Sequence, residues 1–216
     1  MPKPGKTPVQ LLGEPKERMK LAPLRQDRAV RTRALVVVAA AELFAERGFR
    51  GTSVKDVADR AEVTKGAVYF HFPDKETLAS AVVESHYDRR TEVLEDLLVE
   101  RLSPLDTVVV LLDRMAIAFR DDPVIQGGAR LQNERTFIQA NLPEPFVGWT
   151  DLLTALLHDA AKAGQLRSGA DPAALARSFV AAFFGVQHIS DRLHGRTDIA
   201  ERWAETRDLL LRAACG

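Results

Sequence analysis

The stretch TKGAVYFHFPDKETL, which begins at Thr64, places polar side chains at a spacing suited to contacts with a polyanion. Thr64, Lys65 and Tyr69 carry a hydroxyl, an ammonium group and a phenol, and such groups hydrogen-bond to phosphate oxygens and base edges. Gly66 and Ala67 lie between them, and small residues allow a helix to approach another surface closely. We interpret the stretch as a short helix that recognises DNA.

The competing interpretation is a short linking helix whose aromatic end is buried in a core. Phe70 and Phe72 fit that interpretation, and we expect both rings to anchor the helix to its own small domain. Pro73 ends the helix, and Asp74 caps the one that follows.

Histidine and aspartate pairs elsewhere suggest an enzyme only weakly. His158 precedes Asp159, and His188, Asp191 and His194 follow one another at helical spacing. The sequence contains no metalloprotease, serine-hydrolase or phosphate-loop motif, and its one cysteine is next to the C-terminus. Histidines on amphipathic helices are more often polar neighbours than ligands. We therefore expect no catalytic residue, no metal and no cofactor.

The elements that position these residues are predicted to be helices. One helix runs from about Arg25 to Gly48, and its expected buried face consists of Val30, Ala34, Val37, Val38, Ala41 and Phe44. A second helix starts at a cap, either Thr52 or Ser53, with Asp56 placed to complete a capping box. Two short helices joined by a tight turn and preceded by a longer one are typical of a helix-turn-helix.

The rest of the chain also follows helical spacing, without a convincing strand or repeat. The further helices are expected over about 75–101, 104–120, 123–128, 133–140, 147–163, 171–195 and 198–214. The predicted fold class is all-α, with an N-terminal three-helix helix-turn-helix domain, a larger C-terminal helical domain and about nine or ten helices in total.

Composition indicates the class and the compartment of the protein. Hydrophobic residues make up 46% of the chain, but no run of 18 apolar residues exists, so we expect no membrane span. One cysteine cannot form a disulfide within the chain, and we expect a cytoplasmic protein.

The charges are distributed unevenly although the net charge is zero. Through Phe72 there are 14 Lys and Arg against 8 Asp and Glu, and from Pro73 onward 16 against 22. A non-specific architectural DNA binder would be basic throughout, whereas this pattern fits a DNA-binding region confined to the N-terminal third. A mixed-charge surface with a floppy basic tail explains the charges equally well.

At these residues the sequence resembles a known family. GTSVKDVADRAEVTKGAVYFHFPDKETL, with the preceding AAAELFAERGF, is similar to the DNA-binding domain of TetR-family transcriptional regulators, over roughly Arg31 to Leu78. Glu62 departs from the family, which often has Gly at this turn. The resemblance implies a homodimer that binds a partly palindromic double-stranded operator and is released by a small ligand. It also implies DNA contacts by Thr52, Thr64, Lys65, Gly66, Tyr69 and His71, and a phosphate contact by Lys75.

Two further stretches narrow the resemblance. VIQGGARLQNE and PEPFVGWTDLL resemble the γ-butyrolactone receptor subgroup, which controls antibiotic production in actinobacteria. The implied ligand is a small signalling molecule of the butyrolactone, butenolide or alkylfuran type. The alternative is a TetR-type repressor or activator that responds to an unrelated ligand or to none.

Such a ligand needs an apolar cavity with a few polar groups. Trp149 stands where the subgroup carries its pocket tryptophan, Tyr87 lies on the long helix after the DNA-binding domain, and Gln132 can both donate and accept. The apolar candidates are Met115, Phe119, Phe146 and Phe183, for which plain core packing is the competing expectation.

The resemblance divides the chain into a flexible arm (1–24), a helix-turn-helix domain (25–73) and a ligand-binding and dimerisation domain (74–216). The arm is basic, and its Lys and Arg residues either follow a groove of the DNA or have no role. The last two long helices are expected to pair with their copies in a dimer, to form intrachain core, or both. Their apolar residues are Leu175, Phe179, Ala182, Phe183, Val186, Ile189, Ile199, Trp203, Leu210 and Leu211.

Overall fold

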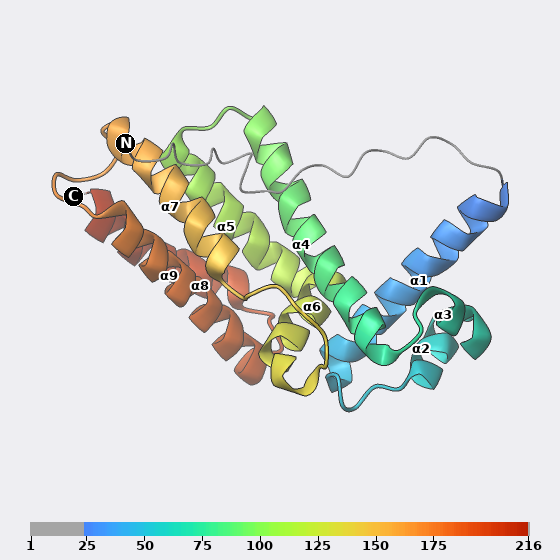
Figure 1. Ribbon diagram of the computed structural model, residues 1–216. Coiled ribbons are helices and arrows are strands. Elements are labelled where there is room, and N and C mark those ends of the chain that lie inside the picture. Colours follow the sequence, from blue (N-terminus) through green and yellow to red (C-terminus); the bar gives the residue numbers. More distant parts are fainter. Residues whose placement is uncertain (1–23, 216) are drawn as a thin grey trace. The chain divides into compact units, whose positions relative to one another are not determined.

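The computed structural model describes residues 24–215, so the arm predicted over 1–24 lies almost entirely outside the described residues. Within this range the chain forms helices and no strand, which confirms the all-α prediction (Figure 1). None of the described helices is long and apolar enough to cross a membrane. The helices are α1 (Leu24–Arg47), α2 (Val54–Arg60), α3 (Lys65–His71), α4 (Lys75–Val99), α5 (Pro104–Asp121), α6 (Pro123–Asn133), the 3-10 helix η2 (Arg135–Phe137), α7 (Val147–Lys162), α8 (Pro172–His194) and α9 (Ile199–Cys215).

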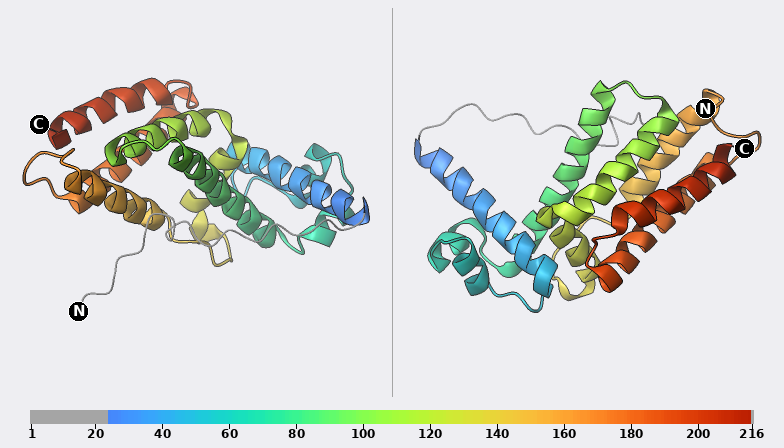
Figure 2. Two further views of the ribbon diagram at one scale, coloured as in Figure 1. Left: turned by 90° about the horizontal axis from the view of Figure 1, so that it is seen from above. Right: turned by 180° about the vertical axis from the view of Figure 1, so that it is seen from behind.

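The described residues divide into two compact units. Figure 2 shows the helices from above and from behind. The helix-turn-helix unit comprises residues 24–90 and 122–143, and it therefore contains α1 to α3, most of α4, α6 and η2. The C-terminal unit comprises residues 91–121 and 144–215, with the end of α4, α5 and α7 to α9.

Side-chain caps define where the short helices begin. Ser53 caps α2, and Asp56 completes the predicted capping box by accepting a hydrogen bond from the Ser53 backbone N–H at 2.9 Å. The Thr64 hydroxyl accepts from the Ala67 N–H at 3.1 Å, which fixes the first turn of α3. These local signals were read correctly from the sequence.

The buried face of α1 differs from the prediction. Val37, Ala41 and Phe44 are buried as expected, but Val30 and Val38 are 60% and 37% exposed. Ala34 is exposed as well, so these three assignments were wrong. Burial begins at Val36 and then covers a wider face than one stripe, because α2, α3 and α6 all pack against this part of α1.

The glycine pair of α6 does not end a helix, as the sequence had suggested, but lies inside one. A Cβ on Gly127 would come within 2.4 Å of the Ala41 carbonyl oxygen, and one on Gly128 within 2.3 Å of the His86 Cβ. The two glycines therefore let α6 pack closely against α1 and α4. Beyond Asn133 only the single turn η2 forms, so the predicted helix over 133–140 was wrong.

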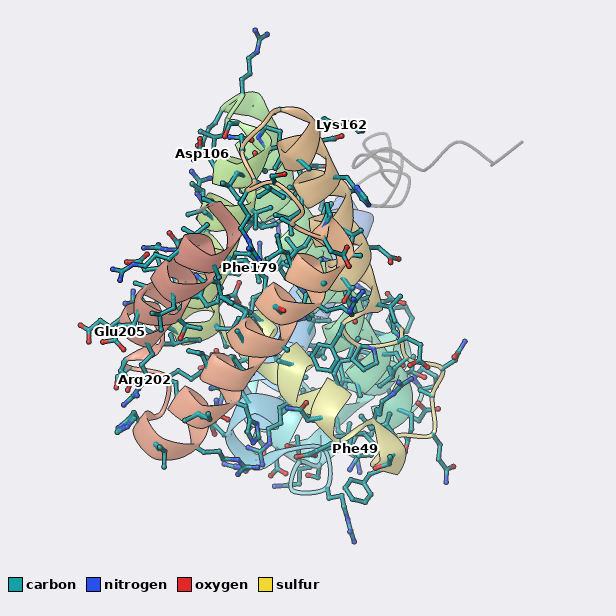
Figure 3. The ribbon with its side chains drawn as sticks, turned by 90° about the vertical axis from the view of Figure 1, so that its left-hand side faces the viewer. Phe49, Asp106, Lys162, Phe179, Arg202 and Glu205 are labelled. Carbon is teal, nitrogen blue, oxygen red and sulfur yellow. The ribbon has the colours of Figure 1, made fainter. Side chains whose placement is uncertain are left out.

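In the C-terminal unit, α5, α7, α8 and α9 pack as a four-helix arrangement in which α5 contacts α7 and α9, and α8 contacts α7 and α9. Phe179 and Trp203 lie fully inside this unit. Figure 3 shows Arg202 and Glu205 extending from α9 into solvent, whereas Phe179 points into the interior. The amphipathic pattern of the last two helices thus serves the intrachain core first.

Candidate functional site

The helix α3 has one buried and one open side. Val68 is fully buried and Phe72, its C-cap, is 2% exposed, so these two side chains attach α3 to the core. Lys65, Gly66 and Tyr69 are on the exposed side. The Lys65 ammonium lies 5.5 Å from the centroid of the Tyr69 ring, so the two polar groups form one neighbourhood.

Phe70 was predicted to be buried, and this prediction was wrong. Its side chain is 79% exposed, and its ring meets only the edge of His71 among the aromatic contacts, at 5.0 Å. A helix of seven residues offers few inward positions, and Val68 and Phe72 occupy them.

Gly66 is the second residue of α3 and has no packing reason to be glycine. The nearest atom to a Cβ built there is the Thr64 hydroxyl oxygen, at 3.9 Å. Glycine costs roughly 1 kcal/mol relative to alanine in a helix interior and less in the first turn. The fold of this chain therefore does not require the bare backbone at Gly66.

Two residues expected to contact DNA make side-chain hydrogen bonds within the chain. Thr52 is 2% exposed, and its hydroxyl donates toward the carbonyls of Gly48 at 2.9 Å and Leu43 at 3.2 Å. The Lys75 ammonium donates to the Phe49 carbonyl at 3.0 Å and to the Thr52 carbonyl at 3.2 Å. The Thr52 side chain is too deeply buried to contact DNA. The Lys75 ammonium has one N–H that these two hydrogen bonds do not use.

The remaining α3 candidates, Ala67 and His71, are half-buried. They border the exposed side without lying at its centre. The predicted helix is present and most of the α3 residues predicted to contact DNA are exposed or half-buried, whereas Phe70 was placed on the wrong side.

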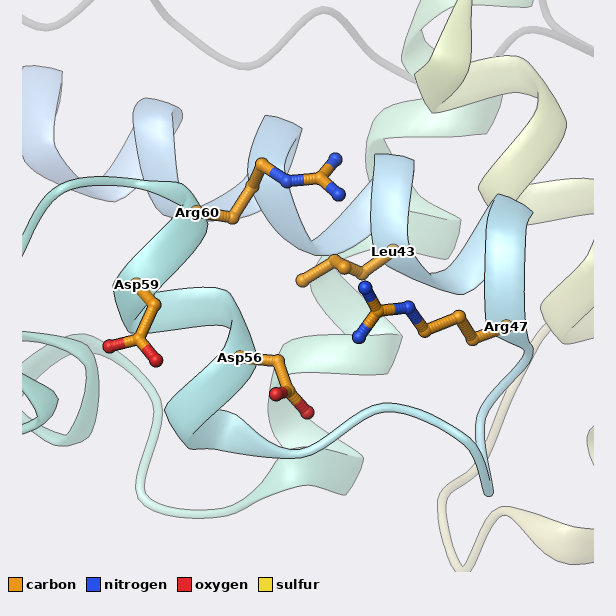
Figure 4. A pocket seen from close by; sticks show the side chains of 5 residues that line it. All are labelled: Leu43, Arg47, Asp56, Asp59 and Arg60. Carbon is orange, nitrogen blue, oxygen red and sulfur yellow. The ribbon is translucent and has the colours of Figure 1, made fainter.

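A shallow charged hollow lies nearby between α1 and α2 (Figure 4), with a volume of about 420 Å³ and a lining of Leu43, Arg47, Asp56, Asp59 and Arg60. Its charges are largely neutralised inside the unit. Arg60 donates to Glu42 at 2.9 Å and to Glu46 at 3.1 Å, and its hydrogen bond to Glu46 lowers the pKa of that carboxyl. The hollow does not resemble an apolar ligand site.

Gln132 and Tyr87, two of the predicted ligand contacts, are hydrogen-bonded to each other. The Gln132 amide nitrogen donates to the Tyr87 hydroxyl at 3.0 Å and to the Pro143 carbonyl at 3.2 Å. Gln132 is only 8% exposed, yet its side-chain oxygen has no hydrogen-bond partner among the residues that the structure describes. A buried amide oxygen without a donor is costly, and a bound ligand with an O–H or N–H can satisfy it.

Residues on α6 tie this helix to the C-terminal end of α1. Glu134, the C-cap, accepts from the Phe49 N–H at 2.7 Å, and Arg130 donates to the Ala45 carbonyl at 2.8 Å. Arg130 and Glu134 are also paired, at 3.0 Å. We call these two side chains the α6 clasp. It satisfies backbone groups that the end of α1 leaves open.

The other predicted ligand residues, in the C-terminal unit, form an aromatic cluster. Trp149 is 3% exposed and its ring centroid lies 6.4 Å from that of Phe183, which contacts Phe119 at 5.8 Å. Met115, Phe119 and Phe183 are fully buried, as the core-packing alternative expected. Phe146, at the start of α7, is 43% exposed and has a left-handed backbone with φ of 66°, which is strained for a bulky residue.

Phe184 was missed by the sequence reasoning and lies at the centre of this cluster. Its ring contacts those of Phe146, Trp149, Phe119 and Phe183 at 4.8, 5.9, 6.0 and 5.3 Å. The 3–4 spacing of apolar residues along α8 assigned the inward face to other residues, among them Phe179 and Phe183. The consecutive Phe183–Phe184 pair was the available signal, because such a pair makes one side of a helix unusually aromatic.

The two aspartates of the histidine and aspartate pairs form ion pairs with basic residues. Asp159 lies 2.9 Å from Lys162, and Asp191 lies 2.9 Å from Arg196. The His194 ring lies 3.6 Å from Asp198, which also pairs with Arg202. Among the described residues, no group of three or more His, Cys, Asp or Glu is placed to hold a metal ion.

Large apolar side chains remain exposed on the last two helices. Ile189 and Leu193 on α8 are 51% and 67% exposed, and Leu209 on α9 is 66% exposed. Phe179, Phe183, Ile199 and Trp203 are buried within the chain. The intrachain-core part of the prediction is confirmed for these four residues, and the dimer interface stays a prediction.

Two family models match the chain. The model described as "Bacterial regulatory proteins, tetR family" matches residues 36–82, which include α2 and α3. The model described as "Tetracyclin repressor-like, C-terminal domain" matches residues 102–215, which include the aromatic cluster.

Individual proteins are similar over most of this chain. The A-factor receptor protein of Streptomyces griseus is 34% identical over 183 residues, which cover 83% of this chain and 63% of that receptor, so this chain spans less than two thirds of it. A solved structure described as "Molecular basis for control of antibiotic production by a bacterial hormones" is 59% identical and covers 87% of this chain and 99% of its own, with a TM-score of 0.81. CprB of Streptomyces coelicolor, solved with its biological operator sequence, is 32% identical over 87% of this chain and 90% of its own, with a TM-score of 0.78.

Proposed function

This chain belongs to the TetR family of bacterial regulatory proteins, and on that premise we propose that it is a transcriptional repressor released from operator DNA by a small signalling molecule. The ligand is of the butyrolactone, butenolide or alkylfuran type, and the controlled genes are those of antibiotic production. The similarity to the A-factor receptor and to a protein described as acting in hormone control of antibiotic production supports this assignment. The protein acts in the cytoplasm as a homodimer.

The single observation that carries the DNA-binding part is the open side of α3. Lys65 and Tyr69 expose polar groups beside Gly66, whose missing side chain has no explanation inside the chain. Close approach of a DNA backbone or base edge explains it, because even one methyl group would keep the helix away. Thr64, Ala67 and His71 flank this surface and are proposed as further contacts. Lys75 is proposed to give its remaining N–H to a phosphate.

The ligand contacts that we propose are in two groups. Tyr87 and Gln132 supply hydrogen bonds, and the support for them is the buried Gln132 oxygen that has no partner. Trp149 and Phe146, together with Phe184, supply apolar contacts, and the strained backbone of Phe146 supports a role beyond packing. Met115, Phe119 and Phe183 lie behind them in the core.

Release follows from the way Gln132 is connected within the helix-turn-helix unit. The helix that carries it, α6, is joined to the end of α1 by the α6 clasp. A ligand that moves Gln132 therefore moves α1, on which α2 and α3 pack. In a dimer, two recognition helices must lie about 34 Å apart to enter successive major grooves of one DNA face. A small movement of α1 therefore changes the distance between the two recognition helices of the dimer.

The exposed Ile189, Leu193 and Leu209 support dimerisation through α8 and α9. Buried apolar surface drives association, and a two-fold contact between copies of the same helices would cover these residues.

Replacing Gly66 tests the DNA-binding proposal while leaving the fold intact. Because a Cβ at this position meets no atom closer than 3.9 Å, we expect Gly66→Ala to keep or raise the melting temperature, by at most about 2–4 °C, the shift for the roughly 1 kcal/mol of a helix-interior glycine in a chain of this size. The same change should weaken binding to DNA from the protein's own promoter at least tenfold, measured by fluorescence anisotropy at fixed salt. An affinity equal to that of the wild type would remove the support for α3 as the DNA-reading helix.

A further inference from the structure

Phe70 is a large apolar side chain in a place where the fold gains nothing from it. It is 79% exposed, and leaving a phenylalanine in water forgoes the benefit of burying it. The other exposed aromatic residue of α3, Tyr69, has a hydroxyl that can face water, and Phe70 has none. A partner outside this chain is the remaining source of contacts for the ring.

The position of Phe70 on α3 indicates where that partner lies. In a helix with 3.6 residues per turn, the residues two places before and after Val68 point away from it. Because Val68 is fully buried, Gly66 and Phe70 lie on the outermost ridge of α3. They are four residues apart and therefore lie one above the other on that ridge.

Gly66 leaves the ring of Phe70 an open apolar surface. A Cβ built at Gly66 would lie more than 4 Å from every side-chain atom of Phe70, so the glycine backbone and the Phe70 ring are both open. No side chain at Gly66 covers the ring, and only the Thr64 hydroxyl comes near that position, at 3.9 Å. Lys65 and Tyr69 beside this ridge carry polar groups, whereas the ridge itself carries none.

The partner of an apolar ridge in a major groove is defined by the chemistry of the bases. Of the four bases, only thymine presents an apolar group there, its C5 methyl, and phenylalanine is one of the residues that contact it. We infer that Phe70 is a specificity-determining residue that contacts the thymine methyl group at one position in each operator half-site. This inference rests on the proposed DNA-reading role of α3.

The test removes the methyl group and the ring separately. An operator is first selected from randomised double-stranded DNA with the wild-type protein, and each thymine is then replaced in turn by deoxyuridine, which lacks only the methyl group. The wild type should lose about fourfold in affinity at one position per half-site, the factor that corresponds to about 0.8 kcal/mol for one buried methyl. Phe70→Ala should bind the two DNAs equally, and Phe70→Leu, which keeps an apolar side chain, should retain part of the difference.

Phe137→Ala is the matched control. Phe137 is 54% exposed and belongs to η2 of the same unit, and its ring lies 5.5 Å from the guanidinium of Arg50, which is not among the residues proposed to contact DNA. This variant should discriminate thymine from deoxyuridine as the wild type does. Melting temperatures of all variants confirm that each is folded.

Three results would overturn the inference. These are a selected operator without thymine, a wild type that ignores every methyl removal, and a Phe70→Ala variant that still loses affinity at the same position. In each of them a sequence is selected, so the proposed function stands. If the wild-type protein selects no sequence at all, the proposed DNA-binding function fails together with the inference.

Discussion

Of the two polar atoms in the Gln132 side-chain amide, the nitrogen is hydrogen-bonded to described residues and the oxygen is not. Its nitrogen donates twice, to Tyr87 and to Pro143, while its oxygen is buried without a partner. Most buried polar atoms in folded proteins are satisfied, and exceptions often mark positions that act on a ligand. The Gln132 oxygen can therefore accept a hydrogen bond that no described group of the chain provides.

Replacing Gln132 by leucine should separate ligand binding from DNA binding. We expect Gln132→Leu to weaken the ligand about 10- to 100-fold, the range for loss of one buried hydrogen bond, and to change operator affinity less than twofold. Calorimetric titration with a synthetic alkyl γ-butyrolactone measures the first quantity. The control is Gln165→Leu, which loses hydrogen bonds to Leu105 and Ser103 without touching a proposed ligand residue. Equal ligand affinities for wild type and Gln132→Leu would contradict the assignment.

His86 makes the stability of the helix-turn-helix unit depend on pH. Its Nδ1–H donates to the Ile125 carbonyl at 3.0 Å, and the imidazole is held neutral. Burial is the main cause that lowers its pKa from 6.5 to about 4; the charge of Arg90 lowers it further, while that of Asp122 opposes the shift. As the pH falls, the unfolded chain therefore takes up the proton first, and stability is lost between about pH 6.5 and pH 4.

The expected loss from His86 between pH 7 and pH 5 is about 2 kcal/mol. Urea unfolding of the wild type and of His86→Asn at both pH values measures it. The asparagine variant starts less stable, because a smaller side chain leaves a cavity, so the useful quantity is the difference between the two pH values. That difference should be about 2 kcal/mol smaller for the variant. Identical pH dependence in the two proteins would show that His86 is not the titrating group.

Residue types alone predicted much of α3 but not its orientation. Thr64 was recognised as a cap because hydroxyl caps have a local signature, and the structure confirms it. Phe70 was misplaced because an aromatic residue was taken for core, and seven residues are too few for periodicity to separate inside from outside. The burial of Thr52 depends on the Leu43 and Gly48 carbonyls, which only the folded turn brings near it.

At the scale of elements, α6 carries Gln132 and packs against α1, on which α2 and α3 also pack. Its glycines allow close packing on α1, and its C-terminal end is attached to α1 through the α6 clasp. A Cβ at Gly48 would come within 2.4 Å of the Glu134 carboxylate, so that carboxylate fills the space over the turn after α1. The contact is specific in shape as well as in hydrogen bonding.

Removing the carboxylate of the α6 clasp should loosen this connection. Glu134→Ala leaves the Phe49 N–H without its acceptor, and we expect it to lower the free energy of unfolding by about 2 kcal/mol. Glu134→Gln keeps an acceptor oxygen and should keep most of that stability. Lys162→Ala, which breaks an exposed ion pair to Asp159, is the control and should cost under about 0.5 kcal/mol. Urea titrations of the three variants compare these values; equal losses for Glu134→Ala and Lys162→Ala would show that the clasp adds nothing.

Sequence patterns predicted helices with side-chain caps better than helices joined through glycine. Asp171 followed by proline predicted the start of α8 correctly. The Gly127–Gly128 pair was taken for a helix end because glycine is the common C-terminal stop, and its real role depends on Ala41 and His86, which are distant in sequence. Phe184 was missed for a similar reason, since its neighbours come from α5 and α7.

At the scale of the whole molecule, the two units contain different proposed functional features. The helix-turn-helix unit carries the open face of α3, the Gln132–Tyr87 pair and the α6 clasp. The C-terminal unit carries the aromatic cluster and the exposed apolar residues of α8 and α9. Residues 24–72, which contain α1 to α3, carry nine Lys and Arg against six Asp and Glu.

The central claim is that one chain binds an operator and releases it when it binds a small signalling molecule. The most direct measurement is equilibrium binding of the wild-type protein to DNA from its own promoter and to a scrambled sequence, at fixed salt. A butyrolactone, a butenolide and an alkylfuran probe are added separately. We predict that the promoter is preferred at least 100-fold, and that one probe weakens promoter binding by a factor in the range of about 5 to 150. No preference for the promoter, or promoter binding that none of the three probes weakens, would contradict the account.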